Sequence, residues 1–206
     1  MATETQPTIP IHAATQAAWK PYRLTVKQFL AMIDAGIFPH DAHVELLGGI
    51  LIEMMVKGDP HDYALDAIAQ ELRRLTPEGW LLREDKSLQL GLRSRPEPDV
   101  AVVRGPRRKY HQRTPQARET ALVVEVSSST YAYDRGEKWR AYAWARIPIY
   151  WIVNLDQNQI EVYTEPTGRG KKALYRSSQT FPIDSEIPVV IDGQDMGRII
   201  VKDILP

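Results

Sequence analysis

Cysteine is missing from all 206 residues of the chain, which excludes disulfides, zinc–cysteine sites and thiol nucleophiles. Because disulfides belong to oxidising compartments, this absence fits the cytoplasm, which is the expected location. Long apolar runs are missing too, since none approaches the roughly 18 residues of a membrane span. The N-terminus also lacks the basic-then-apolar pattern of a signal peptide. We therefore expect neither a membrane segment nor export.

An excess of either charge is also missing, because 26 lysines and arginines balance 26 aspartates and glutamates. This balance argues against a protein that coats DNA through charge alone. The composition is otherwise that of an ordinary globular protein, with 43% apolar and 25% charged residues. A chain of 206 residues predicts a single domain. We place this domain at residues 21–206, after a loose tail at residues 1–20.

The hydrophobic pattern predicts a mixed α/β fold, with a central β-sheet flanked by helices. Thr25 is expected to cap a first helix that runs to residue 34. A Gly-Gly pair between two apolar runs predicts a hairpin of residues 44–47 and 50–54. Residues 80–90 are expected to form one strand or a bent pair. The remaining strands are expected at residues 98–103, 121–126, 149–153, 160–163, 173–175 and 187–191, with a basic loop at residues 104–120.

Capping signals predict two further helices. Asp59 and Pro60 open the second, with Asp59 supplying the cap oxygen and proline at the first helical position. A third is expected to begin at Asp134, with Glu137 three residues on as in a capping box, and to end before Pro148. The expected order is thus helix, hairpin, helix, strands, helix, strands.

Three acidic residues occupy apolar strands, where a carboxylate is costly. They are Glu45, Asp99 and Glu125. A lone buried carboxylate costs several kcal/mol and needs a cation, a donor or a proton. If the strands of Asp99 and Glu125 are neighbours, the period of two allows both side chains to point to the same side of the sheet. Such a cage of oxygens suits Mg²⁺ or Mn²⁺.

Lys138 is the fourth member of this group. It lies early in the third expected helix, from which it could reach the metal site and orient the attacking water or neutralise charge on a phosphate. Each member also has an ordinary interpretation. These are a turn cap for Asp99, an ion pair with Arg95 or Arg135 for Glu125, an exposed hairpin position for Glu45, and a solvated i,i+4 pair with Asp134 for Lys138.

These residues stand in motifs of a known family. The motifs are Pro98-Asp99, Val124-Glu125-Val126, Asp134-Arg135-Gly136-Glu137-Lys138, residues 142–153, Glu45-Leu46-Leu47-Gly48-Gly49 and His61. With them, residues 25–205 resemble the Uma2 family of restriction-type endonucleases, which is abundant in cyanobacteria. The family belongs to the PD-(D/E)XK nuclease superfamily. The resemblance implies a restriction-endonuclease-like core with an N-terminal helix and hairpin.

The resemblance also implies roles for individual residues. Asp99 and Glu125 would be metal ligands, with the Val126 carbonyl as a third and Glu45 as an additional ligand, direct or through water. In the usual motif a lysine lies two residues after the second acid, but in this chain that position is a serine. The family moves the lysine onto the following helix, and Lys138 matches that place as the catalytic lysine. Two departures are Ser127-Ser128-Ser129, where the family often has Ser-Pro-Ser, and Ile149, where it often has an acid.

The leading functional expectation is therefore a Mg²⁺- or Mn²⁺-dependent endonuclease that hydrolyses phosphodiester bonds in DNA. Basic residues near Asp99 would hold the DNA backbone, or would simply be solvated. His61 would contact phosphate or be an ordinary surface histidine at a helix start. The basic residues expected to hold the DNA backbone are Arg95, Arg107, Arg108 and Lys109.

Two other classes of function remain open. One is a nuclease-fold protein that binds nucleic acid or a protein partner without cutting, and the other is a two-carboxylate enzyme such as a glycosidase. Restriction-type enzymes often use two copies to cut two strands, so a homodimer is a further expectation. The apolar strand at residues 149–153 would then be either its interface or core.

Overall fold

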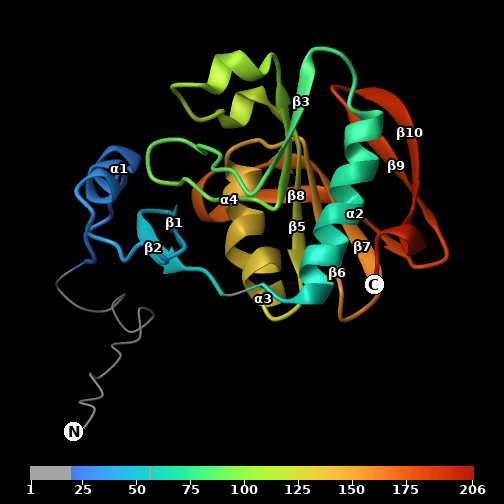
Figure 1. Cartoon of the computed structure of the whole chain (residues 1–206), viewed down its shortest axis with the longest axis horizontal. Helices are drawn as coiled ribbons and strands as arrows, with labels where there is room; N and C mark the ends of the chain where they lie inside the picture. Colours follow the sequence, from blue (N-terminus) through green and yellow to red (C-terminus); the bar gives the residue numbers. More distant parts are fainter. Residues whose placement is uncertain (1–19, 56) are drawn as a thin grey trace, which may run out of the picture.

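A six-stranded sheet lies at the centre of the structure, a computed structural model that describes residues 20–55 and 57–206 (Figure 1). Most of the tail expected at residues 1–20 therefore lies outside the described residues. In sheet order the strands are β3 (Trp80–Glu84), β4 (Val100–Arg104), β5 (Thr120–Ser127), β6 (Ile149–Asn154), β7 (Gln159–Thr167) and β8 (Leu174–Pro182). β5 and β6 run parallel, and the other neighbouring pairs run antiparallel.

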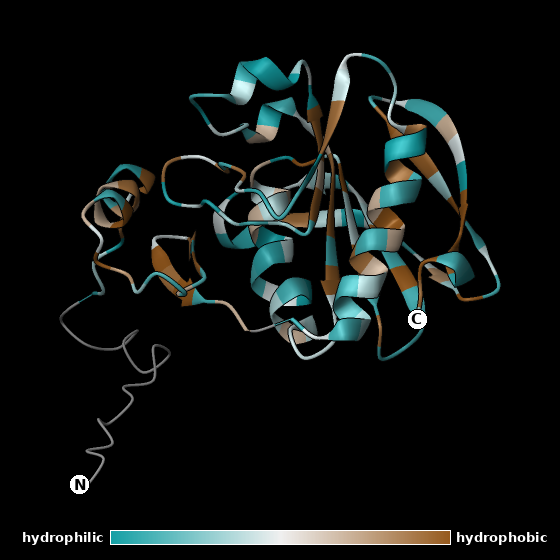
Figure 2. Ribbon diagram, in the orientation of Figure 1, coloured by the Kyte–Doolittle hydropathy of each residue, from teal (hydrophilic) through white to brown (hydrophobic). Residues whose placement is uncertain are grey.

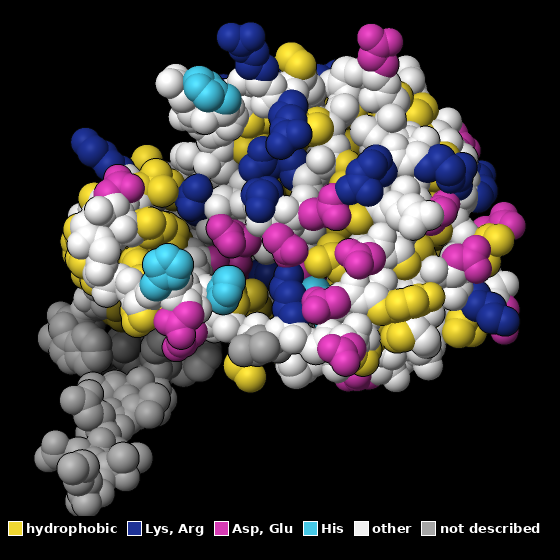
Figure 3. Space-filling view, in the orientation of Figure 1, with side chains coloured by type: hydrophobic (Ala, Val, Ile, Leu, Met, Phe, Trp, Pro, Cys, Tyr) yellow, Lys and Arg dark blue, Asp and Glu magenta, His cyan; other side chains and the backbone are white. Residues whose placement is uncertain are grey.

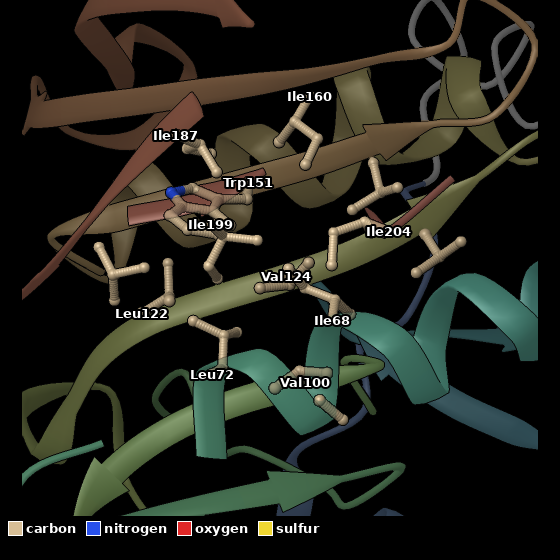
Figure 4. Close-up of a cluster of buried hydrophobic side chains, with 14 of the residues drawn as sticks. Ile68, Leu72, Val100, Leu122, Val124, Trp151, Ile160, Ile187, Ile199 and Ile204 are labelled. Atoms are coloured by element: carbon tan, nitrogen blue, oxygen red, sulfur yellow. The ribbon is translucent and has the colours of Figure 1, made fainter. Parts of the chain in front are cut away.

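Successive strand residues point to opposite faces of the sheet and build two separate cores. One face carries Val100 and Val124 and is covered by α2 (Asp59–Leu75) together with the hairpin of β9 (Glu186–Ile191) and β10 (Gln194–Ile200). Figure 4 shows this cluster, in which side chains of α2, the sheet and the hairpin interdigitate.

The other face carries Ala101 and Val123 and is covered by one continuous helical segment. Its parts are α3 (Tyr131–Tyr133), the π-helix η4 (Asp134–Lys138) and α4 (Trp139–Trp144). Helices therefore flank a mixed central sheet, and the fold class predicted from the sequence is confirmed.

β5 and β6 are the most deeply buried strands of the sheet. Every residue of β5 is buried, and Figure 2 shows the central strands in brown while α2 carries both colours. β6 lies between β5 and β7, and its residues from Tyr150 to Asn154 are all buried. The segment at residues 149–153 is therefore core, and it is not available as a dimer interface.

A small N-terminal layer packs beside the sheet, on the left of Figure 1. It consists of α1 (Val26–Asp34) and a hairpin of β1 (Val44–Leu47) and β2 (Ile50–Glu53). Thr25 accepts from the Gln28 backbone in a capping box, so the expected helix start is confirmed, as is the Gly-Gly hairpin. This layer is joined to the rest of the molecule by a β-bridge between Leu46 and Arg95.

Two predicted caps are wrong. The residue before α2 is Gly58, and Asp59 is the first helical residue rather than the cap. The third helical segment starts at Tyr131 instead of Asp134, and the Asp134 carboxylate accepts hydrogen bonds from the hydroxyls of Ser127 and Thr130. In both places an acid near a helix start has the local pattern of a cap, but neither side chain caps the helix.

Several strand bounds also differ from those predicted. β3 ends at Glu84 instead of residue 90, β8 extends the short strand expected at residues 173–175 to Pro182, and β10 was not expected. β8 is an edge strand whose residues are mostly exposed, so it lacks the apolar alternation that reveals a strand. Short 3-10 turns are η2 (Arg107–Tyr110), η3 (Ala117–Glu119), η5 (Gly170–Lys172) and η6 (Val201–Asp203). Within the described residues, the helices are too short or too polar to cross a bilayer.

Replacement of Gly49 by alanine tests the hairpin turn. Gly48 and Gly49 have φ values of 58° and 82°, which suit a tight turn between paired strands. A Cβ on Gly49 would lie 2.8 Å from Cβ of Arg23 and 2.9 Å from the carbonyl oxygen of Leu24. We expect Gly49→Ala to lower the free energy of unfolding by about 1–3 kcal/mol in urea denaturation.

Gly48→Ala is the matched control for this turn. Its Cβ would meet nothing within 4 Å, so only the positive φ opposes the substitution. We expect a loss of about 1 kcal/mol or less. Equal losses in the two variants would show that the close approach of Gly49 to Arg23 does not contribute.

Candidate active site

The antiparallel pairing of β4 and β5 places the two predicted metal ligands at the same end of the sheet. Val100, which follows Asp99, pairs with Val124, which precedes Glu125. A cavity of about 380 Å³ opens at this end, between the start of α2 and the π-helix. The ionisable side chains of its lining are Lys57, His61, Glu97, Asp99, Glu125, Asp134, Lys138 and Asp156.

Asp99 is buried at the cavity wall, and both of its carboxylate oxygens have partners. The Val126 backbone N–H donates to Oδ2 at 2.6 Å, and Lys57 Nζ donates to Oδ1 at 2.7 Å. Nε2 of His61 lies 3.3 Å from the same Oδ1. Burial opposes the charge of this carboxylate, but His61 and the charges of Lys57 and Lys138 outweigh burial and lower the pKa of Asp99 to about 2.

Glu125 lies deeper, on β5, between a tyrosine and a lysine. The Tyr142 hydroxyl donates to Oε1 at 2.7 Å, and Lys138 Nζ lies 3.1 Å from Oε2. Burial raises the pKa of Glu125 well above its ordinary value, and the charges of Asp134 and Asp99 add to this effect, while Lys138 opposes it. The alternative of an ion pair between Glu125 and Arg95 or Arg135 is wrong, because its partner is Lys138.

Lys138 is 1% exposed and lies among three carboxylates. Its Nζ lies 3.1 Å from Glu125, 3.6 Å from Asp134 and 3.8 Å from Glu45. Burial alone would lower the pKa of Lys138, but the surrounding carboxylates raise it above its ordinary value, so the side chain is a cation. The alternative of a solvated helix lysine is therefore wrong.

Glu45 is 0% exposed and lies behind Lys138. It accepts hydrogen bonds from the Tyr133 hydroxyl at 2.7 Å and from the Glu97 backbone N–H at 3.2 Å. The alternative of an exposed hairpin glutamate is wrong. Glu45 does not line the cavity, so its contacts position the lysine, and its expected role as a metal ligand stays a prediction.

The π-helical turn of η4 carries both Asp134 and Lys138 toward the sheet, and both are buried. The Tyr150 hydroxyl donates to the Asp134 carbonyl at 3.0 Å, which satisfies a backbone group in the widened turn. π-helical turns within α-helices are frequent at functional sites. No local sequence signal marks such a turn. The sequence around Asp134 therefore predicts a helix cap instead.

The basic residues expected to hold DNA lie away from the cavity. Arg107, Arg108 and Lys109 follow the far end of β4, roughly 15 Å from Asp99 by the rise of an extended strand. Figure 3 shows basic side chains gathered over this upper region and acidic ones across the middle of the same face. Arg95 contacts Thr114 and does not line the cavity. Their role in binding DNA stays a prediction.

His61 and Val126 do line the cavity. The Val126 N–H is engaged by Asp99, and the expected role of its carbonyl as a ligand stays a prediction. Residues at the site that were not predicted from the sequence are Lys57, Tyr133 and Tyr142. Asp134 was expected only as the i,i+4 partner of Lys138, and that pair is present at 3.6 Å, although it is buried.

The charge balance of the site fits a divalent cation. Within residues 20–55 and 57–206, no three His, Asp or Glu side chains meet in metal-ligand geometry. Four buried carboxylates nevertheless face one buried lysine, and Lys57 at the cavity edge only partly compensates for them. Asp99 and Glu125 supply the hard oxygen donors that Mg²⁺ and Mn²⁺ prefer. A cation between these two residues would oppose the remaining negative charge and would favour the ionised form of Glu125, which burial disfavours.

Comparisons with known proteins agree with this architecture. The model of the Uma2 family, described as "Putative restriction endonuclease", matches residues 26–191. A solved structure of "a putative nuclease belonging to DUF820" from Anabaena variabilis superposes with a TM-score of 0.62 at 15% identity, over 88% of this chain and 97% of that chain. That likeness shows the fold, and no curated protein matches the chain. Since the family model spans most of the sequence, the chain belongs to the Uma2 family of restriction-endonuclease-like proteins.

Proposed function

We propose that the protein is a divalent-cation-dependent endonuclease that hydrolyses phosphodiester bonds in DNA, with Asp99, Glu125 and Lys138 as its catalytic residues. The observation that carries the proposal is a lysine buried among three carboxylates at the wall of an open cavity. Replacing such a buried ion cluster by apolar residues is often neutral or stabilising, so stability alone does not account for it. A hydrolytic site does account for it.

Asp99 and Glu125 would hold the cation, Mg²⁺ or Mn²⁺, with the Val126 carbonyl as a further ligand. When bound, the cation would polarise the phosphate and lower the pKa of the attacking water. Lys138 would donate a hydrogen bond to that water or to a phosphate oxygen, because its ammonium is held toward the cavity by Glu125 and Asp134. Cleavage of both strands would call for two copies, and a dimer would use a surface other than β6.

Cleavage assays with matched variants test this proposal. Plasmid, short duplex and single-stranded DNA are incubated with Mg²⁺, Mn²⁺ or EDTA. We expect cleavage that needs the cation and that falls by roughly 10²–10³-fold in Glu125→Gln, which keeps the side-chain shape but removes the charge. Glu137→Gln lies on the same helical segment but is exposed, and it should cleave like the unaltered protein.

Cleavage that survives Glu125→Gln would point to a contaminating nuclease and would contradict the site. A protein that binds Mn²⁺ through Glu125 but cuts no DNA would favour the second candidate, a nuclease-fold protein that binds without cutting. That candidate is favoured by one observation, because Lys57 already contacts the Asp99 oxygen that faces the cavity.

A further inference from the structure

Lys57 lies between two carboxylates at the edge of the cavity. Its Nζ is 2.7 Å from Oδ1 of Asp99 and 2.5 Å from Oδ1 of Asp85. Asp99 is buried, whereas the Asp85 side chain is half exposed. Lys57 itself is 37% exposed, so its ammonium lies where the protein interior meets solvent.

The position that Lys57 occupies is one that a cation at Asp99 would need. Oδ2 of Asp99 is taken by the Val126 backbone N–H, which a strand holds in place. Oδ1 is the oxygen left for the cavity, and Lys57 and His61 both approach it. A divalent cation at Oδ1 would lie close to the ammonium, and like charges at such short range repel.

Asp85 can hold the Lys57 ammonium after it leaves Asp99. Its four-carbon side chain is flexible, unlike the planar fork of an arginine, and it rises from the segment between β2 and α2. Asp85 already holds the ammonium on the solvent side. In Figure 3, acidic side chains lie around a few basic ones in the region to the left of the start of α2. Once the ammonium has left Asp99, its remaining partner Asp85 lies on the solvent side, where an approaching phosphate would meet it.

We infer that Lys57 is the counter-ion of Asp99 in the absence of metal, that a divalent cation displaces it, and that the released ammonium then binds a phosphate of the DNA backbone. The second step rests on the proposed function. Lys57 is a substrate-positioning residue in this scheme, and it keeps the buried Asp99 neutralised until the cation arrives. One side chain thus links loading of the metal to binding of the substrate.

Mn²⁺ binding tests the first step without any need for cleavage. Isothermal titration of Mn²⁺ alone compares the full-length protein with Lys57→Met and with Lys86→Met, a control at an exposed neighbouring lysine. We expect Lys57→Met to bind Mn²⁺ about tenfold more tightly, because its competitor is gone. Lys86→Met should bind like the unaltered protein. Unchanged or weaker Mn²⁺ binding by Lys57→Met would overturn the inference.

DNA binding at saturating Mn²⁺ tests the second step. The KM for a short duplex is measured where the duplex is cut, and its Kd by fluorescence anisotropy where it is not. We expect Lys57→Met to raise KM or Kd about threefold to tenfold with little change in kcat, and Lys57→Arg to restore most of the loss. An unchanged KM or Kd would overturn the phosphate contact. Because Mn²⁺ affinity is measured separately, failure of the proposed nuclease activity is distinguishable from failure of this inference.

Discussion

Lys138→Met is expected to lower the free energy of unfolding by about 3–5 kcal/mol, because it leaves buried carboxylates without their cation. Glu125, Asp134 and Glu45 all lie within 3.8 Å of Nζ in the folded protein. In the unfolded chain the same carboxylates are hydrated, so the penalty falls on the folded state alone. Urea denaturation at neutral pH without added metal measures the difference between the two proteins.

Glu45→Gln in the Lys138→Met background provides the control. The amide keeps the shape of the side chain while removing one of the uncompensated charges, so the double variant should recover part of the lost stability. A loss below about 1 kcal/mol in Lys138→Met would contradict the expected desolvation cost. It would show that water screens the carboxylates, or that Glu125 takes up a proton when Lys138 no longer opposes the effect of burial on its pKa.

Trp151→Ala should lower the free energy of unfolding by a similar amount, about 3–5 kcal/mol, because it removes buried apolar contacts and leaves a cavity. Trp151 lies on β6, is 1% exposed, and packs in the cluster between the sheet, α2 and the β9–β10 hairpin (Figure 4). Truncation leaves a cavity that neighbouring strands cannot fill, since β6 is held by β5 and β7 on either side. Thermal and urea unfolding both measure this loss.

Trp144→Ala is the matched control for Trp151→Ala. Trp144 ends α4 and is 50% exposed, so its removal should change stability by about 0.5 kcal/mol or less. Equal losses in the two tryptophan variants would contradict the assignment of this cluster as the main core. The cavity residues are untouched by Trp151→Ala, so the folded fraction should still bind Mn²⁺ at low temperature.

The convergence of Asp99, Glu125 and Lys138 could be predicted because it depends on local regularities. Alternation along two apolar strands places both acids on one side, and a lysine early in the next helix lies over the same face. The burial of Glu45 was harder to predict, because a glutamate on a hairpin usually faces water unless it is paired. Its burial depends on Tyr133, which lies 88 residues further along the chain.

Other parts of the site could not be predicted, for physical reasons. Lys57 contacts Asp99 across 42 positions of sequence, and nothing in its own neighbourhood marks that contact. Asp134 has the local pattern of a helix cap. Because it lies in the π-helical turn, its carboxylate instead contacts Ser127, Thr130 and Lys138. The density of basic residues at positions 104–113 indicates that the segment is exposed to solvent, but it does not indicate at which end of the sheet the segment lies. The course of β4 then carries that segment to the end of the sheet away from the cavity.

The contact between Glu45 and the buried Lys138 limits how far the chain can be shortened from its N-terminal side without opening the candidate site. A fragment starting at Asp59 would keep the whole six-stranded sheet and both helical layers, and by strand count it would look complete. It would nevertheless lack Glu45 and Lys57, so one end of the lysine cluster would open to water and Asp99 would lose its ammonium partner. The hairpin that carries Glu45 and the segment that carries Lys57 therefore belong to the candidate site, and a design that transfers the site to a new scaffold would have to include both.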